Sequence, residues 1–302
     1  MGTPEFAVPS LEALVRDRWD VRCVVTAPDK PVGRGLHVRP SPVKTAAAAA
    51  GIEVLQPATL NDPGFHEALR ACRPDIIAVV AFRILPTSVI DIPALGAFNL
   101  HASLLPKYRG AAPINHALMN GETVTGVTTF FLERTVDTGN VILQRSVPIE
   151  PDDDAGTLHD RLSLVGADAV VETVRLIAAG SAPRLPQDAS LATPAPKIFR
   201  EQCRIDWNRP ATSVVNQIRG LSPHPGPFTS HEGREIHVYR AAAVQPPRAL
   251  APGEILLDGR QLIVGTADGA VRLIELQQQG RKRMGVEEFL RGYRFRDGER
   301  FV

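Results

Sequence analysis

The sequence predicts a two-domain α/β protein, with a Rossmann-like, open and parallel-type sheet in the N-terminal domain and a small, OB-like β-barrel at the C-terminus. Three observations support this class. Strand-like and helix-like segments alternate in the first half, a proline-rich stretch follows, and Asp-Gly dipeptides separate short apolar runs in the last third. Alternating elements are typical of helix-covered sheets, whereas closely spaced hairpins are typical of barrels.

Hydrophobic patterns place the elements of the N-terminal domain. Residues 75–82 form a continuous apolar run after a proline, which is typical of a strand buried on both faces of a parallel sheet. Apolar residues recur at helical spacing from Leu158 to Ile177, before Gly180, and predict a helix of about 22 residues. Further strands are expected at residues 19–26, 97–101 and 126–132, and helices at 41–50 and 112–120.

The proline-rich stretch sets the expected domain boundaries. Four prolines interrupt a run of small residues: Pro183, Pro186, Pro194 and Pro196. Proline blocks regular structure, so this segment should be an extended connector. We therefore expect a catalytic domain at residues 1–181, a linker at 182–203 and a β-rich domain at 204–302. Asp258-Gly259 and Asp268-Gly269 are expected to form hairpin turns in the last of these.

Composition excludes several classes of protein. Hydrophobic residues make up 44% of the chain and charged residues 22%, which is typical of a globular protein rather than a disordered one. No apolar run is long enough to span a membrane, and the first residues lack the features of a secretory signal. The three cysteines are far apart and predict neither a disulfide framework nor a metal site. We expect a cytoplasmic protein.

The charge distribution is uneven. Residues 204–302 carry 15 Lys and Arg residues against 11 Asp and Glu residues, whereas the remainder carries 19 against 22. A basic last third fits a domain that approaches a polyanion. Ordinary fluctuation in composition explains such a surplus equally well.

The first candidate catalytic residues lie within residues 99–103. Asn99, His101 and Ser103 alternate with apolar residues, so in an extended segment they would share one face. They would lie at the carboxyl end of a strand, where open α/β folds bind their ligands. An amide and an imidazole can together hold a carbonyl oxygen as it gains negative charge. Taken alone, Asn-x-His is a weak signal, and it fits better two residues that satisfy backbone groups at the end of a strand.

A second cluster follows at Asp137-Thr138-Gly139. The Asp and Gly predict a tight turn between two strands, from which the carboxylate projects. Close to His101, this carboxylate would orient the imidazole and favour its cationic form. The alternative is an Asx-turn, in which Asp137 caps its own backbone.

Together these segments resemble the formyltransferase family, and in particular its methionyl-tRNA formyltransferases. The most specific string runs from Ser103 to Ile114, reading Ser-Leu-Leu-Pro-x-Tyr-Arg-Gly-Ala-Ala-Pro-Ile. The similarity begins at Gly2-Thr3-Pro4-Glu5-Phe6-Ala7 and continues beyond the linker to Arg281-Lys282-Arg283, so it covers nearly the whole chain.

The resemblance implies a reaction. The α-amine of methionine on initiator tRNA would attack the formyl carbon of 10-formyltetrahydrofolate, without a metal. Asn99 and His101 would hold the formyl oxygen, and Asp137 would tune His101 and accept the amine proton, directly or through water. Whether His101 or Asp137 takes the proton stays open. The folate contacts that the family implies fall on Ser103, Leu104, Leu105 and Pro106.

The resemblance also implies tRNA contacts, in a protein expected to be a monomer. These fall on Arg34 in the Gly33-Arg34-Gly35 loop, Lys197 in the linker, and the tail residues Arg281, Lys282 and Arg283. Two departures weaken this expectation. Leu36-His37 follow the loop where family members often have lysines, and Pro194 stands where many have Tyr.

Three other functions remain as alternatives. A formyltransferase that uses a sugar nucleotide or a phosphoribosylamine would need the first domain but not the basic second one. A formyl-folate hydrolase would use water in place of the amine, and an inactive tRNA- or folate-binding module would need no chemistry. Intact Asn99, His101 and Asp137 argue against the inactive module. The Arg34 loop and the basic tail argue against the other two.

The start of the chain carries one further expectation. Family members have a short apolar strand directly before Gly-Thr-Pro, whereas here Met1 precedes Gly2 directly. The first strand of a doubly wound sheet lies in its interior, so its loss would leave backbone groups unpaired in a buried place. We therefore expect Met1 to be an internal methionine, and we expect either a slot in the sheet beside residues 76–80 or neighbouring strands drawn together across it. A true start at Met1, with another segment filling the gap, is the alternative.

Overall fold

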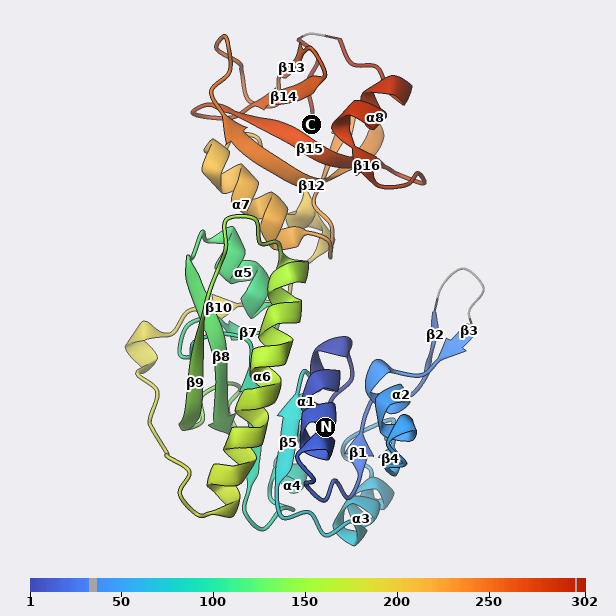
Figure 1. The fold of residues 1–302 in the computed structure, drawn as a ribbon, viewed down its shortest axis with the longest axis vertical. Coiled ribbons are helices and arrows are strands. Elements are labelled where there is room, and N and C mark those ends of the chain that lie inside the picture. The colour runs from blue at the N-terminus through green and yellow to red at the C-terminus, as the bar shows by residue number, and fades with distance from the viewer. Residues whose placement is uncertain (33–36, 297) are drawn as a thin grey trace. The chain divides into compact units, whose positions relative to one another are not determined.

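The computed structural model describes residues 1–32, 37–296 and 298–302, and these fall into two compact units (Figure 1). The first unit contains three stretches, 1–110, 124–148 and 159–195. The second contains residues 111–123, 149–158 and 196–302. Each unit thus draws on distant parts of the sequence.

The first unit is built on a four-stranded sheet in the order β5-β6-β8-β9. Its strands are β5 (Ile77–Val80), β6 (Ala97–His101), β8 (Val124–Phe131) and β9 (Val141–Pro148). β5 and β6 are parallel, whereas β8 is antiparallel to both of its neighbours. The strands expected at 75–82, 97–101 and 126–132 are confirmed, and the Rossmann-like sheet is mixed.

Beside this sheet lies a separate parallel pair, β1 (Val24–Val25) and β4 (Val54–Leu55). Short helices surround the two sheets: η1 (Glu5–Ala7), α1 (Val8–Arg16), α2 (Pro42–Ala49), α3 (Pro63–Ala71) and α4 (Thr87–Ile90). The helix expected at 41–50 is confirmed, and its start is fixed by Ser41, whose hydroxyl accepts a hydrogen bond from the Lys44 amide at 3.1 Å.

A short antiparallel pair, β2 (Lys30–Val32) and β3 (His37–Arg39), projects from this region (Figure 1). The loop expected to carry Arg34 falls between these strands and lies outside the described residues.

The helix expected around residues 158–177 is α6 (Ala155–Ala178). Asp154 caps its start by accepting a hydrogen bond from the Thr157 amide at 2.9 Å, and Gly180 ends it with a φ of +66°. α6 packs closely against the sheet, because a Cβ at Gly166 would lie 2.6 Å from a methyl carbon of Leu100. Of the described helices, none is long and apolar enough to cross a membrane.

The segment after α6 is mostly extended, with short helical turns at η2 (Ala189–Leu191) and η3 (Arg200–Cys203). Its strand β10 (Pro194–Ala195) pairs in parallel with β7 (Arg109–Gly110), which follows β6 in the chain. Residues 179–195 therefore form part of the first unit, and β10 lies against the chain just beyond His101.

The second unit contains an antiparallel sheet in the order β11-β12-β15-β14-β13, with β16 paired to β15. The bounds are β11 (Phe228–His231), β12 (Arg234–Val244), β13 (Ile255–Asp258), β14 (Gln261–Gly265), β15 (Ala270–Gln278) and β16 (Met284–Gly285). The sheet curls into a half-barrel, which agrees with the predicted β-rich domain. Both Asp-Gly dipeptides lie between paired strands, as predicted.

Helices α5 (Pro113–Met119), α7 (Ala211–Leu221) and α8 (Val286–Gly292) complete the second unit. The expected helix at 112–120 is thus α5, and its residues group with the second unit. The core of this unit is apolar and well covered, and includes Trp207, Val214, Ile236, Leu262 and Leu273.

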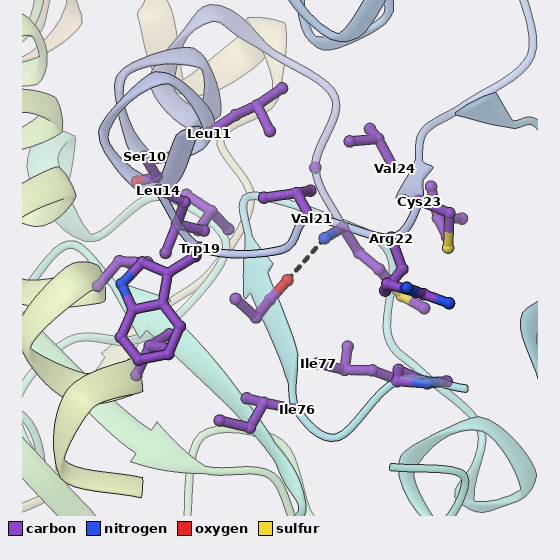
Figure 2. Close-up of a pocket in the computed structure, with 18 of the residues that line it drawn as sticks. Ser10, Leu11, Leu14, Trp19, Val21, Arg22, Cys23, Val24, Ile76 and Ile77 are labelled. Carbon is purple, nitrogen blue, oxygen red and sulfur yellow. Dashed lines mark hydrogen bonds between the residues drawn. The ribbon is translucent and has the colours of Figure 1, made fainter. Parts of the chain in front are cut away.

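The first unit also contains a cavity of about 780 Å³ between β1 and β5 (Figure 2). Met1 and Gly2 enter one end of it, and Gly2 forms an isolated parallel bridge with Val80. The slot expected beside residues 76–80 is therefore present.

Candidate active site

β6 delivers two of the candidate residues to the end of the sheet. Asn99 pairs in register with Val79 on β5 and Phe130 on β8, and His101 is the last residue of the strand. Alternation along the strand places Asn99 and His101 on the same face. Asn99 is half-buried, and among the described residues its side-chain amide has no hydrogen-bond partner. Its two N–H donors are therefore available to a ligand.

His101 is buried, and its ring is oriented by the chain that follows. The Nε2 atom lies 2.8 Å from the carbonyl oxygen of Tyr108. Because a carbonyl only accepts, Nε2 carries the hydrogen and Nδ1 is the bare nitrogen of a neutral ring. Nδ1 lies 3.8 Å from Oδ2 of Asp137, so protonation of the ring would complete an ion pair.

Asp137 is also buried, in a loop between β8 and β9. Its Oδ2 accepts a hydrogen bond from the Gly110 amide at 2.9 Å, and its φ of +56° is one that Asp tolerates better than most residues. Two residues on, a Cβ at Gly139 would lie 1.7 Å from the carbonyl oxygen of Phe131. Only glycine fits there, so the close approach of the loop to β8 fixes where the carboxylate lies.

Gln187 links this loop to the chain beyond β6. Its Nε2 donates to the carbonyl oxygens of Asp137 and Gly139, at 3.0 and 2.9 Å. Its Oε1 accepts from Nε and Nη2 of Arg109, at 3.2 and 2.7 Å. One side chain thus links the Asp137 loop to Arg109, which directly follows Tyr108 in the chain. No pattern in the sequence marks Gln187, because a single Gln among prolines belongs to no recognised motif.

The residues expected to contact folate form a tight bend after β6. Ser103 is fully buried and donates from Oγ to the Lys107 carbonyl oxygen at 2.6 Å. The Leu105 amide donates to Oγ1 of Thr128 at 3.1 Å, and Nε2 of Gln144 donates to the Leu105 carbonyl oxygen at 2.8 Å. Since the strand ends at His101, Ser103 does not continue its extended face. Leu104 and Pro106 are half-buried and present apolar surface, whereas Leu105 is buried.

The expected tRNA contacts lie in the second unit, apart from Arg34, which is outside the described residues. Arg281, Lys282 and Arg283 form the exposed turn between β15 and β16. Lys282 pairs with Glu288 at 2.9 Å and Arg283 pairs with Glu275 at 2.6 Å. Within the described part of the chain, the Arg281 guanidinium has no ion-pair or hydrogen-bond partner.

Lys197 is exposed, and its ammonium lies 5.5 Å from the centre of the Phe199 ring. Phe199 is itself 58% exposed, so the pair combines a cation with an apolar ring on the surface of the second unit. Such a pair suits a ligand with both phosphates and bases. Among the described residues, no cluster of three or more His, Cys, Asp and Glu side chains could hold a metal ion.

Solved structures with a similar fold include two proteins of low sequence identity. WlaRD, a sugar 3N-formyl transferase solved in the presence of dTDP and 5-N-formyl-THF, has a TM-score of 0.68 and 18% identity over 93% of this chain and 97% of its own. HypX from Aquifex aeolicus, in complex with tetrahydrofolic acid, has a TM-score of 0.60 and 22% identity over 83% of this chain and 47% of its own. At these identities the likeness concerns the fold alone.

Sequence comparison finds relatives of much higher identity than these structures. A methionyl-tRNA formyltransferase from Chlorobium phaeovibrioides is 49% identical over 307 residues, which span 100% of this chain and 96% of that protein. The formyl transferase model matches residues 1–174, and the model of the formyl transferase C-terminal domain matches residues 197–294. With both models matched and this identity sustained along the whole chain, the protein belongs to the formyl transferase family.

Proposed function

We propose that this protein transfers the formyl group of 10-formyltetrahydrofolate to the α-amine of methionine on initiator tRNA, for the initiation of translation. The observation that carries the proposal is the site at the end of β6, where the free amide of Asn99 shares a strand face with a His101–Asp137 pair. Relatives named methionyl-tRNA formyltransferase match the full chain at 47–49% identity, and they favour tRNA over the other acceptors.

The reaction needs hydrogen-bond donors for the formyl oxygen and an acceptor for the amine proton. The amine nitrogen forms a bond to the formyl carbon, the bond from that carbon to N10 of the folate breaks, and N10 gains a proton as the amine loses one. In between, the formyl oxygen carries negative charge. Donors aimed at this oxygen stabilise the transition state more than the ground state, which is the effect that raises the rate.

Asn99 fits the role of oxygen donor because the described residues leave its amide without a partner. His101 has its Nε2 hydrogen committed to Tyr108, so Nδ1 is the ring atom left for the reaction. Nδ1 and the Asp137 carboxylate act as one proton-accepting unit: a proton taken by the ring is stabilised by the carboxylate 3.8 Å away. No step requires a metal.

The folate is proposed to lie against the bend formed by residues 103–106. The backbone of this bend is tied to Thr128 and Gln144, so it presents a fixed surface. Half-buried Leu104 and Pro106 offer apolar area for a flat pterin ring. HypX, a solved structure with a similar fold, was determined in complex with tetrahydrofolic acid, which supports a folate as the formyl donor.

The charged tRNA is proposed to bind through Lys197 and the turn formed by Arg281, Lys282 and Arg283, with Arg34 as a further contact. Backbone phosphates attract such side chains regardless of base sequence, and they position the acceptor end rather than identify it. We further propose that the protein acts as a monomer in the cytoplasm, where charged tRNA is used.

The direct test of the proposed function compares formyl transfer to charged initiator tRNA with a control that lacks tRNA. Formate release without tRNA would instead identify a hydrolase, and formylation of an amino sugar nucleotide would identify the other acceptor class.

We predict that Asn99→Ala lowers kcat by about 10²–10³-fold, or about 2.7–4 kcal/mol, because one oxyanion donor is lost. The dissociation constant for folate, measured by fluorescence titration, should change little. Asn61→Ala, at an exposed asparagine, is the matched control. Turnover close to that of the wild type in Asn99→Ala would refute the donor role.

We predict that His101→Ala and Asp137→Ala each lower kcat severely, and that the double variant is little worse than the poorer single one. Residues that act as a unit show such non-additivity. Single-turnover rates of the two single variants and the double variant measure it. Fully additive losses would mean that the two side chains act independently.

We predict that Gln187→Ala lowers kcat on the order of tenfold and changes KM less, because the loop loses two hydrogen bonds and Asp137 is held less firmly. Gln187→Glu should be at least as damaging, since a carboxylate cannot donate to the carbonyls of Asp137 and Gly139. The pH–rate profile should shift in both variants while the melting temperature changes little. Gln245→Ala, at an exposed glutamine, is the control. An unchanged profile would leave Gln187 with a purely structural role.

We predict that tRNA binding weakens steeply with salt, and that Arg281→Ala reduces the slope of log K against log salt by roughly 0.7–0.9, as expected for one phosphate contact. Filter binding across a salt series measures the slope. Arg16→Ala, an exposed arginine on α1, should leave it unchanged. The same slope in Arg281→Ala and the wild type would exclude a phosphate contact at this turn.

A further inference from the structure

The backbone just beyond β6 contacts both members of the His101–Asp137 pair. The Tyr108 carbonyl oxygen accepts from Nε2 of His101 at 2.8 Å, and the Gly110 amide donates to Oδ2 of Asp137 at 2.9 Å. Because the same short stretch of chain carries both groups, its conformation relates the imidazole to the carboxylate. The placement of residues 108–110 therefore bears directly on the distance of 3.8 Å between Nδ1 and Oδ2.

The backbone of Tyr108 depends on its surroundings to keep its conformation. Its φ of +61° lies in the left-handed region, which a bulky residue rarely adopts, and such a conformation persists only where neighbouring groups hold it. The side chain is buried, which fixes the position of the residue. The peptide groups on either side of it still need hydrogen-bond partners if the carbonyl is to stay aimed at His101.

Thr193, the residue before β10, holds both of these peptide groups. Its Oγ1 accepts from the Tyr108 amide at 2.9 Å, and its carbonyl oxygen accepts from the Arg109 amide at 2.9 Å. The Arg109 amide and the Tyr108 carbonyl belong to one planar peptide group. That group therefore bonds to Thr193 on one side and to the imidazole of His101 on the other, and each bond polarises the group and strengthens the other bond.

The strand pair that follows keeps Thr193 in register. β10 pairs in parallel with β7, so that Pro194 lies opposite Arg109 and Ala195 lies opposite Gly110 (Figure 1). A Cβ at Gly110 would lie 2.6 Å from the Ala195 carbonyl oxygen, so the two backbones approach as closely as glycine allows. This close contact fixes one strand against the other, and with them the position of the Thr193 hydroxyl.

Gln187 and Thr193 act on opposite members of the catalytic pair. Gln187 bonds to the Asp137 backbone and to the Arg109 side chain. Thr193 instead bonds to the backbone that carries the acceptor of His101. Loss of Gln187 therefore loosens the carboxylate, whereas loss of the Thr193 hydroxyl loosens the imidazole.

We propose that Thr193 is a positioning residue for His101, and that it holds the peptide groups of Tyr108 so that Nδ1 of the imidazole faces Asp137. This role rests on the proposed formyl transfer, in which Nδ1 takes the amine proton. Thr193→Val removes the acceptor of the Tyr108 amide but keeps the shape of the side chain and the bond from the Arg109 amide. Because Thr193 is exposed, this change should spare the fold and the melting temperature.

The first readout is the proton on Nε2 of His101, which can be measured without substrate. Burial and the bond to the Tyr108 carbonyl slow its exchange with water, so it should give an NMR signal that is absent in His101→Ala. We expect exchange to be at least about tenfold faster in Thr193→Val and to return to the wild-type rate in Thr193→Ser, which keeps the hydroxyl. Thr212→Val, at an exposed threonine on α7, is the matched control and should leave the rate unchanged. Equal rates in Thr193→Val and the wild type would overturn the proposal, and so would a fast rate that Thr193→Ser does not restore.

The second readout is formyl transfer to charged tRNA. We expect kcat of Thr193→Val to fall on the order of tenfold while KM for the formyl-folate changes less than about twofold, because a misplaced imidazole affects the reaction and not folate binding. Thr193→Ser should recover most of the loss. An unchanged kcat in Thr193→Val would overturn the proposal, as would a lowered kcat with an unchanged Nε2 proton, since Thr193 would then act by a route other than His101. A wild-type protein that does not formylate charged tRNA would instead refute the proposed function, and the Nε2 proton would still decide whether Thr193 positions His101.

Discussion

The hydrogen bonding of β6 on both of its edges is the constraint on which the candidate site depends. β5 pairs with one edge and β8 with the other, so Asn99 lies opposite Val79 and Phe130 with no freedom to shift. A shift by one residue would turn Asn99 and His101 to the opposite face of the sheet. The strand ends at His101, and the chain turns back at once so that the Tyr108 carbonyl binds the ring. Strand register therefore sets the position of the imidazole, and the Tyr108 carbonyl sets its tautomer.

Asp137, the partner of His101, is positioned by contacts within a loop and not by strand register. Asp137 lies in a loop, and three separate contacts replace the rigidity that a strand would supply: the Gly110 amide on its carboxylate, the close approach at Gly139, and the two bonds from Gln187. Gln187 comes from the chain after α6, which also pairs with β7 beside the site. The extended segment that leads to the C-terminal half thus helps to build the site of the first unit.

The sequence predicted most of the fold, because buried strands, the long helix and Asp-Gly turns each leave a local pattern. Alternation and turn chemistry, which are also local, marked Asn99, His101 and Asp137 as candidates, whereas their expected catalytic roles came from the resemblance to the formyltransferase family. Gln187 was not found, since its role arises from a contact with residues about 50 and 78 positions away. The buried hydroxyl of Ser103 also escaped prediction, because the end of β6 at His101 depends on how the following bend packs against Thr128 and Gln144.

The cavity and the candidate site share a structural element. β5 borders the cavity with one edge, and with its other edge it holds β6 in register, where Val79 pairs with Asn99. Met1 and Gly2 hold the end of β5 near Val80, through the bond from the Val80 amide to the Met1 carbonyl oxygen and the bridge at Gly2. Since a displacement of about 1 Å in a reacting group can cost a factor of 100 in rate, the packing of β5 bears on the position of the Asn99 amide. The packing of β5 and the placement of the oxygen donor are in this way one structural problem.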